Sequence, residues 1–202
     1  MEFKEFSDSD GKLLVKTARK IVTEYLEKNE KIELDQEFKS KFSFESGVFV
    51  TINNLQGLRG CIGFPLPQKK LFNALADASL AAATEDPRFS PVKKEELNEI
   101  VFEVTVLSPP VKIQVSNPLD YPTKIKVGTD GLIIKYDFNS GLLLPQVPVE
   151  YGWSEKEFLN NTCEKAGLAA DMWKNSKTEV LKFEGIIYKE EKPNGNVVRK
   201  KL

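Results

Sequence analysis

The sequence predicts an α+β fold with a mainly antiparallel sheet flanked by helices. Stretches rich in β-branched and aromatic residues are joined by short turns, which is typical of hairpins. Helical patterns are few and do not alternate regularly with strands. The chain has 202 residues, enough to bury the core of one domain. We therefore expect a single domain over residues 1–202, with a larger lobe that holds both termini and a smaller lobe.

The first half of the chain is expected to form a helix, a hairpin and a second helix. Apolar residues recur at helical spacing from Leu13 to Leu26, and Ser9 or Asp10 is placed to cap this helix, which ends near Asn29. The second helix has an alanine-rich face that would let it lie close on a sheet. The strands are expected at 47–52 and 58–64, with a turn at 53–57, and the second helix at 70–84.

The second half is expected to contain more strands and one clear helix. Ser154 is placed to cap a helix that runs to Ala166, and Gly167 fits the position after its end. Val104 and Val106 are expected to face the core from one strand. The other predicted elements are a strand at 100–107, a hairpin at 124–136 that turns at 128–131, an apolar segment at 142–148 bracketed by prolines, and a final hairpin at 180–200 that turns at 193–195.

Composition excludes several kinds of site. The chain has no histidine, which excludes serine–histidine and cysteine–histidine catalysis and histidine-based metal sites. Its two cysteines, Cys61 and Cys163, match no metal-site spacing, although one disulfide between them stays open. We expect no metal and no cofactor. Lysine plus arginine (29) nearly balances aspartate plus glutamate (30), so nucleic acid is the least favoured partner.

Nothing in the sequence predicts a membrane protein. Residues 1–6 are charged and contain no apolar signal core. No apolar run approaches the roughly 18–20 residues that span a bilayer. A cytoplasmic, reducing setting is therefore expected.

The segment Leu58–Gly63, with the sequence LRGCIG, is the strongest candidate for a site. Alternation along a strand would place Arg59 and Cys61 on one face, where the guanidinium would favour the thiolate. Gly60 and Gly63 leave room for a ligand or for another backbone. Three alternatives stay open. The glycines could serve helix packing, Cys61 could be a small core residue, and Arg59 could pair with a structural carboxylate.

Two further places carry polar residues in rigid, proline-containing surroundings. Gln146 and Glu150 lie in the segment 144–153, where Glu150 is a candidate counter-ion for Arg59 or a general base. They could instead tie down the loop and cap the helix that begins at Ser154. Arg88, in the sequence DPRF, is held between prolines and could bind a carboxylate or phosphate through two parallel hydrogen bonds, or could pin its loop.

These motifs, in this order, resemble the AMMECR family, which is named after a human chromosomal-region protein. The resemblance covers nearly the whole chain. It rests on LRGCIG at 58–63, DPRF at 86–89, GTDGL at 128–132, LPQV at 144–147 with Glu150 and Trp153, and CEKAGL at 163–168.

The resemblance implies an α+β domain of two lobes, with a cleft lined by residues 58–63. It does not imply a particular activity. Prokaryotic relatives are often encoded with, or fused to, Memo-type proteins and lie near radical-SAM enzymes, so proteins of those two kinds are the expected pathway partners. The resemblance also favours one shared site for Arg59, Cys61, Arg88, Gln146 and Glu150.

Two functions compete at this stage. The first is a module that binds an anionic small molecule or a pathway partner through Arg59, Gly60, Gly63, Arg88 and Gln146. The second is an enzyme in which Cys61 acts as a thiolate nucleophile or redox group, with Glu150 as its base. The sequence does not predict an oligomeric state.

Overall fold

The computed structural model describes residue 3, residues 6–30 and residues 32–200, so part of the charged N-terminal segment lies outside it. The chain divides into two compact units. The larger unit comprises residues 1–107 and 186–201, and the smaller unit comprises residues 108–185. Strand β7 (Glu179–Glu190) begins in the smaller unit and ends in the larger one. The predicted α+β class is confirmed, and every strand pair whose register is given is antiparallel.

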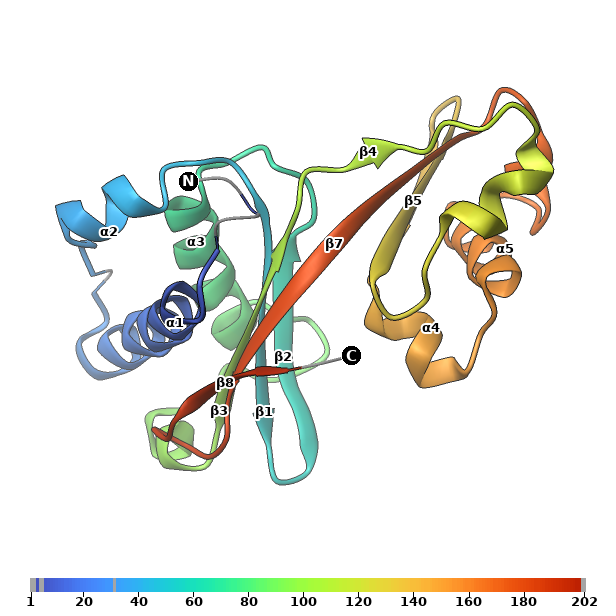
Figure 1. Ribbon diagram of the computed structural model, residues 1–202. Coiled ribbons are helices and arrows are strands. Elements are labelled where there is room, and N and C mark those ends of the chain that lie inside the picture. The colour runs from blue at the N-terminus through green and yellow to red at the C-terminus, as the bar shows by residue number, and fades with distance from the viewer. Residues whose placement is uncertain (1–2, 4–5, 31, 201–202) are drawn as a thin grey trace. The chain divides into compact units, whose positions relative to one another are not determined.

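The larger unit is a sheet covered on one face by helices. Its strand order is β2-β1-β3-β7, and β8 also pairs with β7. Helices α1 and α3 pack against the sheet (Figure 1). The elements of this unit are α1 (Asp8–Lys28), α2 (Gln36–Lys41), β1 (Gly47–Asn54), β2 (Gly57–Phe64), α3 (Leu71–Thr84), the 3-10 helix η2 (Lys94–Asn98), β3 (Val101–Leu107), the C-terminal part of β7, and β8 (Val197–Lys200).

The core of the larger unit follows from the alternation of its strands. On β1 and β3, every second side chain is apolar and fully buried against the helices. The expected inward positions Val104 and Val106 are among them. The buried set includes Val48, Val50 and Ile52 from β1, Phe102 from β3, Leu14, Ala18 and Val22 from α1, and Ala74, Ala78 and Ala82 from α3.

Helix α1 begins earlier than expected. Its cap is Ser7 rather than Ser9 or Asp10, and the Ser7 hydroxyl accepts the Asp10 N–H. The Asp10 carboxylate accepts the Ser7 N–H at 2.9 Å, which completes a capping box. At the other end, Asn29 adopts a left-handed conformation with φ of 56°. Asp10 therefore assists the cap from inside the first turn.

A buried ion pair joins the first helix to the last long strand. Arg19 on α1 makes two hydrogen bonds of 2.6 Å to Glu190 on β7 and also donates to the carbonyls of Leu97 and Ile100. Glu190 in turn accepts the Phe102 N–H at 2.9 Å. Every group that this pair removes from water thus has a partner, as a buried charge requires.

The smaller unit contains the remaining strands of the sheet, which pack on α5. Strand β5 pairs with β6 on one side and with the N-terminal part of β7 on the other, and β4 also pairs with β7. Its core contains Phe158, Leu159, Cys163 and Trp173. The elements are β4 (Val111–Lys112), the 3-10 helix η3 (Pro118–Lys124), β5 (Asp130–Tyr136), β6 (Asn139–Leu143), α4 (Gln146–Tyr151), α5 (Glu155–Lys165), the 3-10 helix η4 (Met172–Lys174) and the N-terminal part of β7.

One expectation for the second half is wrong. The hairpin at 124–136 does not form, because the Asp130 carboxylate accepts the Lys126 N–H and closes residues 126–130 into a turn. Strand β5 pairs instead with the following strand across Asp137, whose φ is 50°. The apolar segment 142–148, to which the sequence assigned no helix or strand, contains the end of β6 at Leu143 and the start of α4 at Gln146.

The described residues contain no helix that is long and apolar enough to cross a bilayer. Both cysteines are free thiols, so the disulfide that composition left open is not formed.

Removing one partner of the Arg19–Glu190 pair should destabilise the larger unit strongly. We expect Glu190→Ala to lower the free energy of unfolding by about 3–5 kcal/mol, because Arg19 would stay buried without a counter-charge. Urea unfolding measures this change. The matched control is Glu24→Ala, which removes an exposed partner of Lys28 and should have little effect on the free energy of unfolding. A loss in Glu190→Ala no larger than in the control would contradict the assignment.

Candidate functional site

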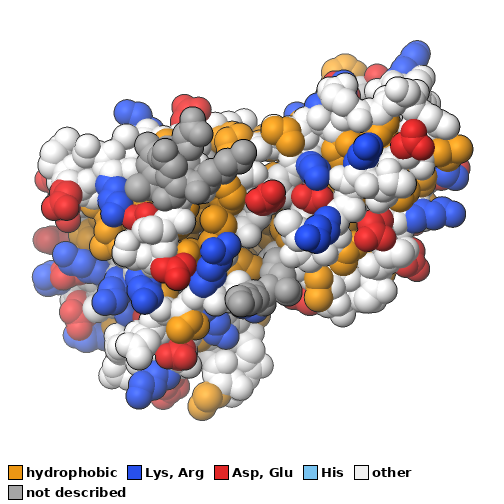
Figure 2. All heavy atoms as spheres, in the orientation of Figure 1, with side chains coloured by type: hydrophobic (Ala, Val, Ile, Leu, Met, Phe, Trp, Pro, Cys, Tyr) orange, Lys and Arg blue, Asp and Glu red, His pale blue; other side chains and the backbone are white. Residues whose placement is uncertain are grey.

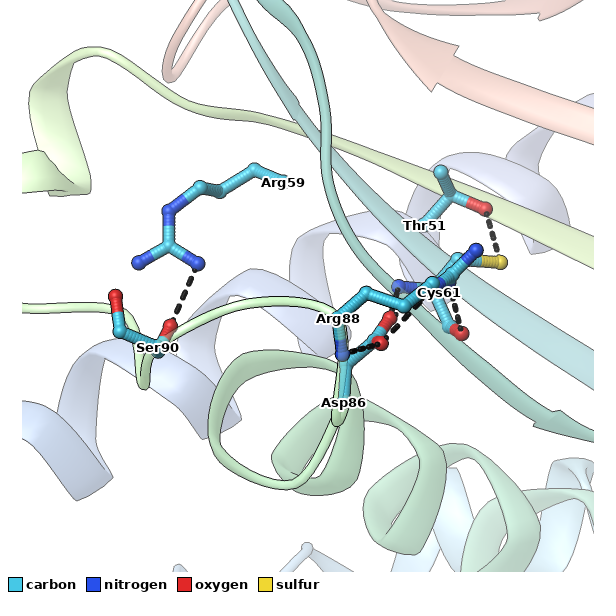
Figure 3. A network of polar contacts seen from close by, with 6 residues as sticks. All are labelled: Thr51, Arg59, Cys61, Asp86, Arg88 and Ser90. Carbon is cyan, nitrogen blue, oxygen red and sulfur yellow. Dashed lines mark hydrogen bonds and ion pairs between the residues drawn. The ribbon is translucent and has the colours of Figure 1, made fainter.

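The LRGCIG segment forms most of β2, which lies at the edge of the larger unit's sheet. Its register against β1 shifts by one residue, since Ile52 faces Gly60 whereas Asn53 faces Leu58. Arg59 therefore has no Cα partner and is the extra residue of a β-bulge. A bulge interrupts the regular alternation of side chains, so the predicted placement of Arg59 beside Cys61 is wrong. Figure 3 shows the two side chains pointing away from each other.

The side chain of Arg59 is bound by residues of the segment that follows α3. Its guanidinium makes two hydrogen bonds to the Glu96 carboxylate, at 2.7 and 3.0 Å, and donates to the carbonyls of Ser90 and Pro91. The side chain is 11% exposed. Hydrogen bonds from Arg59 hold the pKa of Glu96 below its usual value. The counter-ion of Arg59 is thus Glu96 and not Glu150, which bears out the structural alternative.

The backbone of Cys61 is held by two side chains of the DPRF loop, which we call the edge clamp: Asp86 and Arg88. The Asp86 carboxylate accepts the Cys61 N–H at 2.8 Å, and Arg88 Nη2 donates to the Cys61 carbonyl at 3.2 Å (Figure 3). Because β2 is an edge strand, these groups have no neighbouring strand to bind. The clamp supplies the donor and the acceptor that such a strand would provide.

The two members of the edge clamp also bind each other. Arg88 donates from Nε and Nη2 to the two oxygens of Asp86, at 2.9 and 2.7 Å, and its N–H donates to the same carboxylate. These bonds from Arg88, together with the Cys61 N–H, hold the pKa of Asp86 well below its usual range. The Asp86 side chain is 2% exposed, whereas that of Arg88 is 54% exposed. Asp86 was missed as a site residue, although its place two residues before Arg88 suits it to bond the Arg88 N–H.

The thiol of Cys61 is half-buried beside a hydroxyl. Its Sγ lies 3.3 Å from the Thr51 Oγ1 on β1. Thr51 is the register partner of Cys61 on one side and of Glu103 on the other, so the three residues form a row across three strands. Burial raises the pKa of the other thiol, Cys163, to about 11. Cys61 is thus the more accessible of the two cysteines, and neither Thr51 nor Glu103 was a sequence-based candidate.

The glycines of the segment have packing roles. A Cβ on Gly60 would lie 2.1 Å from the Ala82 carbonyl oxygen, so glycine is what lets α3 approach the sheet so closely. A Cβ on Gly63 would lie 2.4 Å from the Val48 carbonyl oxygen and 2.5 Å from the Phe49 ring. Both positions exclude a larger side chain for reasons internal to the fold.

Gln146 and Glu150 belong to α4 of the smaller unit. Gln146 is the first residue of that helix, and its buried Oε1 has no hydrogen-bond partner among the described residues. Glu150 is exposed. It does not cap α5, since the capping box of that helix is formed by Ser154 and Glu157. Shared participation of Gln146 and Glu150 in the Cys61 site stays a prediction.

Two groups at the site thus contact each other, namely Cys61 and Arg88, while Arg59 serves the neighbouring loop. Within the described part of the chain, no cluster of three or more acidic or thiol side chains is placed to hold a metal ion.

The edge clamp should make stability depend on acid pH. The folded-state pKa of Asp86 lies below its unfolded value of about 3.9, so its contribution is complete above that pH and is lost as the pH falls towards the folded-state pKa. We expect Asp86→Asn to be less stable than the wild type near neutral pH, and the difference to shrink as the pH falls below about 4. Urea unfolding across this pH range measures it. A difference that stays constant with pH would contradict the role of the Asp86 charge.

Comparison with known proteins places these features in a family. The AMMECR1 family model matches residues 15–188. A protein of Thermococcus gammatolerans is 50% identical over 200 residues, covering 96% of this chain and 97% of the relative. The protein NEQ441 of Nanoarchaeum equitans is 52% identical over 179 residues, covering 88% of this chain and 99% of the relative. The crystal structure of the uncharacterized protein PH0010 from Pyrococcus horikoshii is similar with a TM-score of 0.89 and 47% identity, covering 98% of this chain and all of that one. The chain therefore belongs to the AMMECR1 family, as its motifs predicted.

Proposed function

We propose that this chain is a binding module that holds an anionic group, of a small molecule or of a partner protein, at the Cys61–Arg88 end of β2. The observation that carries the proposal is the contrast between the two arginines. Arg59 is 11% exposed and donates hydrogen bonds from all three guanidinium nitrogens, whereas Arg88 is 54% exposed and is held in a defined orientation by Asp86.

Arg88 keeps hydrogen-bonding capacity after the clamp has formed. A guanidinium has five N–H donors in a rigid fork. Within the described residues, the bonds of the Arg88 side chain come from Nε and Nη2, so Nη1 is left for a ligand. A donor that is already oriented loses little freedom on binding, and this favours recognition of a carboxylate or phosphate.

Fewer residues are proposed to contact the ligand than the sequence led us to expect. Arg88 is proposed as the direct contact, and Gly60 and Gly63 are proposed to act through the fold, by letting α3 and β1 pack closely on β2. Arg59 would act indirectly, because it binds the carbonyls of Ser90 and Pro91 in the loop that carries Arg88. A contribution from Gln146, and partners of the Memo or radical-SAM type, stay predictions.

Loss of the Arg88 guanidinium should weaken anion binding. We expect inorganic phosphate or a nucleotide to raise the melting temperature of the wild type, and Arg88→Ala to weaken that binding by about tenfold or more, because a charge-assisted hydrogen bond contributes about 1.5–3 kcal/mol. Thermal shift and titration calorimetry measure both. Arg88→Lys keeps the charge without the fork and should bind at an intermediate level, while Arg199→Ala on β8 is the matched control. Unchanged affinity in Arg88→Ala would rule the proposal out.

A second candidate function is catalysis by the Cys61 thiol. The specific observation in its favour is the Thr51 hydroxyl, 3.3 Å from Sγ, which can donate a hydrogen bond to a thiolate. Under this hypothesis Cys61 is the nucleophile or redox group. Glu150 stays the base that the sequence suggested, and its part in the reaction is a prediction.

Alkylation distinguishes the two functions. In a Cys163→Ser background, where Cys61 is the one remaining thiol, the catalytic hypothesis predicts faster reaction with iodoacetamide near neutral pH than for glutathione. Thr51→Val should slow that reaction, because it removes the hydroxyl but keeps the shape. Mass spectrometry over time measures both rates. If Cys61 reacts no faster than glutathione, the catalytic hypothesis is wrong and the binding function is the one that remains.

A further inference from the structure

Three lysines on α1 form a stripe of like charge, away from the site at β2. Lys12, Lys16 and Lys20 follow one another at intervals of four residues and are exposed. No ion pair to any of them is found among the described residues. Figure 2 shows Lys and Arg side chains gathered over the α1 side of the larger unit. We call these residues the lysine stripe.

Local structure does not account for the lysine stripe. Like charges four residues apart destabilise a helix by about 0.2–0.5 kcal/mol per pair. The nearest acids on the helix have other partners, since Glu24 pairs with Lys28, Asp10 pairs with Lys41, and Asp8 accepts the Tyr188 hydroxyl. Features that break local rules without local compensation are typical of functional surfaces.

A groove lies beside the lysine stripe, between α1 and α2, with a volume of about 270 Å³. Leu13 from α1 is 38% exposed on one wall, and Phe38 from α2 is nearly buried in the floor. Two of the groove's three acids have partners, because Glu33 pairs with Lys39 and Asp35 caps α2 by accepting the Phe38 N–H. The lining residues are Leu13, Thr17, Lys20, Ile32, Glu33, Leu34, Asp35, Glu37, Phe38 and Lys41.

We propose that the groove and the lysine stripe together dock an acidic, amphipathic peptide segment of a partner protein. An apolar side chain of that segment would fill the groove against Leu13, Ile32 and Leu34, and its carboxylates would reach the three lysines. The stripe extends over nine residues of helix, with a rise of about 12 Å from the first lysine to the last, which fits a peptide better than a compact small molecule. Lys20 belongs to both features, so charge and apolar contact are presented side by side.

The composition of the groove distinguishes this partner from nucleic acid. Binding of single strands relies on aromatic rings on which bases stack. Among the described residues that line the groove, the one aromatic ring, on Phe38, is 4% exposed and offers no such face, and the other apolar side chains of the lining are aliphatic.

The test uses fluorescence anisotropy with a fluorescein-labelled peptide of about 12 residues, built of alternating pairs of Glu and Leu, which spans about 18 Å if helical. The proposal predicts binding that weakens as salt rises, and a loss of at least about tenfold in the variant Lys12→Glu/Lys16→Glu/Lys20→Glu. Leu13→Asp should weaken binding similarly. A peptide of glutamates alone should bind at least about tenfold more weakly than the amphipathic one, because it cannot fill the groove.

The matched control is the variant Lys156→Glu/Lys165→Glu/Lys177→Glu, which makes the same charge change on exposed lysines of the smaller unit and should bind like the wild type. Far-UV circular dichroism checks that each variant is folded. No binding by the wild type, or equal loss in the control variant, would overturn the proposal. So would tighter binding of single-stranded DNA than of the peptide, or a dimer that the stripe variant converts to a monomer, because the occupant would then be nucleic acid or a second copy.

Discussion

Strand β2 has a paired strand on one side only, and its outward backbone groups need partners of another kind. For Cys61 these partners are the Asp86 carboxylate and the Arg88 guanidinium. This requirement organises the loop that follows α3. Once Asp86 and Arg88 are bound to the strand, Ser90 and Pro91 lie where Arg59 can reach them, and Glu96 completes the contact. The edge of the sheet and the loop are thus held by one connected set of hydrogen bonds.

The same set of hydrogen bonds explains why Arg59 and Arg88 differ in their capacity to bind a ligand. Each has its own carboxylate, Glu96 for Arg59 and Asp86 for Arg88, so these pairs carry no net charge. An anion at this place would have to be recognised by directed hydrogen bonds rather than by a strong field. That condition favours Arg88, whose fork is oriented and still partly open. The lysine stripe on α1 is the opposite case, with net charge and no fixed geometry, and it suits a partner that is drawn in by charge and held by apolar contact.

The parts of the fold that were predicted correctly are those specified by local signals. The β1–β2 hairpin, α3 and α5 each carry their own pattern, turn or cap, such as Ser154 before α5 and the left-handed Gly167 after it. The hairpin predicted at 124–136 is absent because the Gly-rich turn sequence there does not reverse a strand. Asp130 instead closes a turn that precedes β5. The cap of α1 was misplaced by two or three residues because several capping residues adjoin one another.

Cys61 and Arg88, both candidates from the sequence, are in contact in the structure, whereas the geometry around them was not predicted. Arg88, Cys61 and the glycines were identified from residue type and spacing. The bulge at Arg59 depends on how β2 pairs with β1, and the partners Glu96 and Glu190 lie 37 and 171 residues from the arginines they bind. Contacts over such separations leave no local pattern in one sequence. The burial of Asp86 under Arg88 follows from the same long-range arrangement.

The most direct test of the edge clamp is amide hydrogen exchange at Cys61, compared between the wild type and Asp86→Asn. Backbone groups alternate in direction along an antiparallel strand, so the Cys61 N–H points to Asp86 and the Ile62 N–H points to β1. The account predicts that Asp86→Asn lowers the protection of the Cys61 amide selectively and leaves that of Ile62 nearly unchanged. Equal protection of Cys61 in both proteins would contradict it.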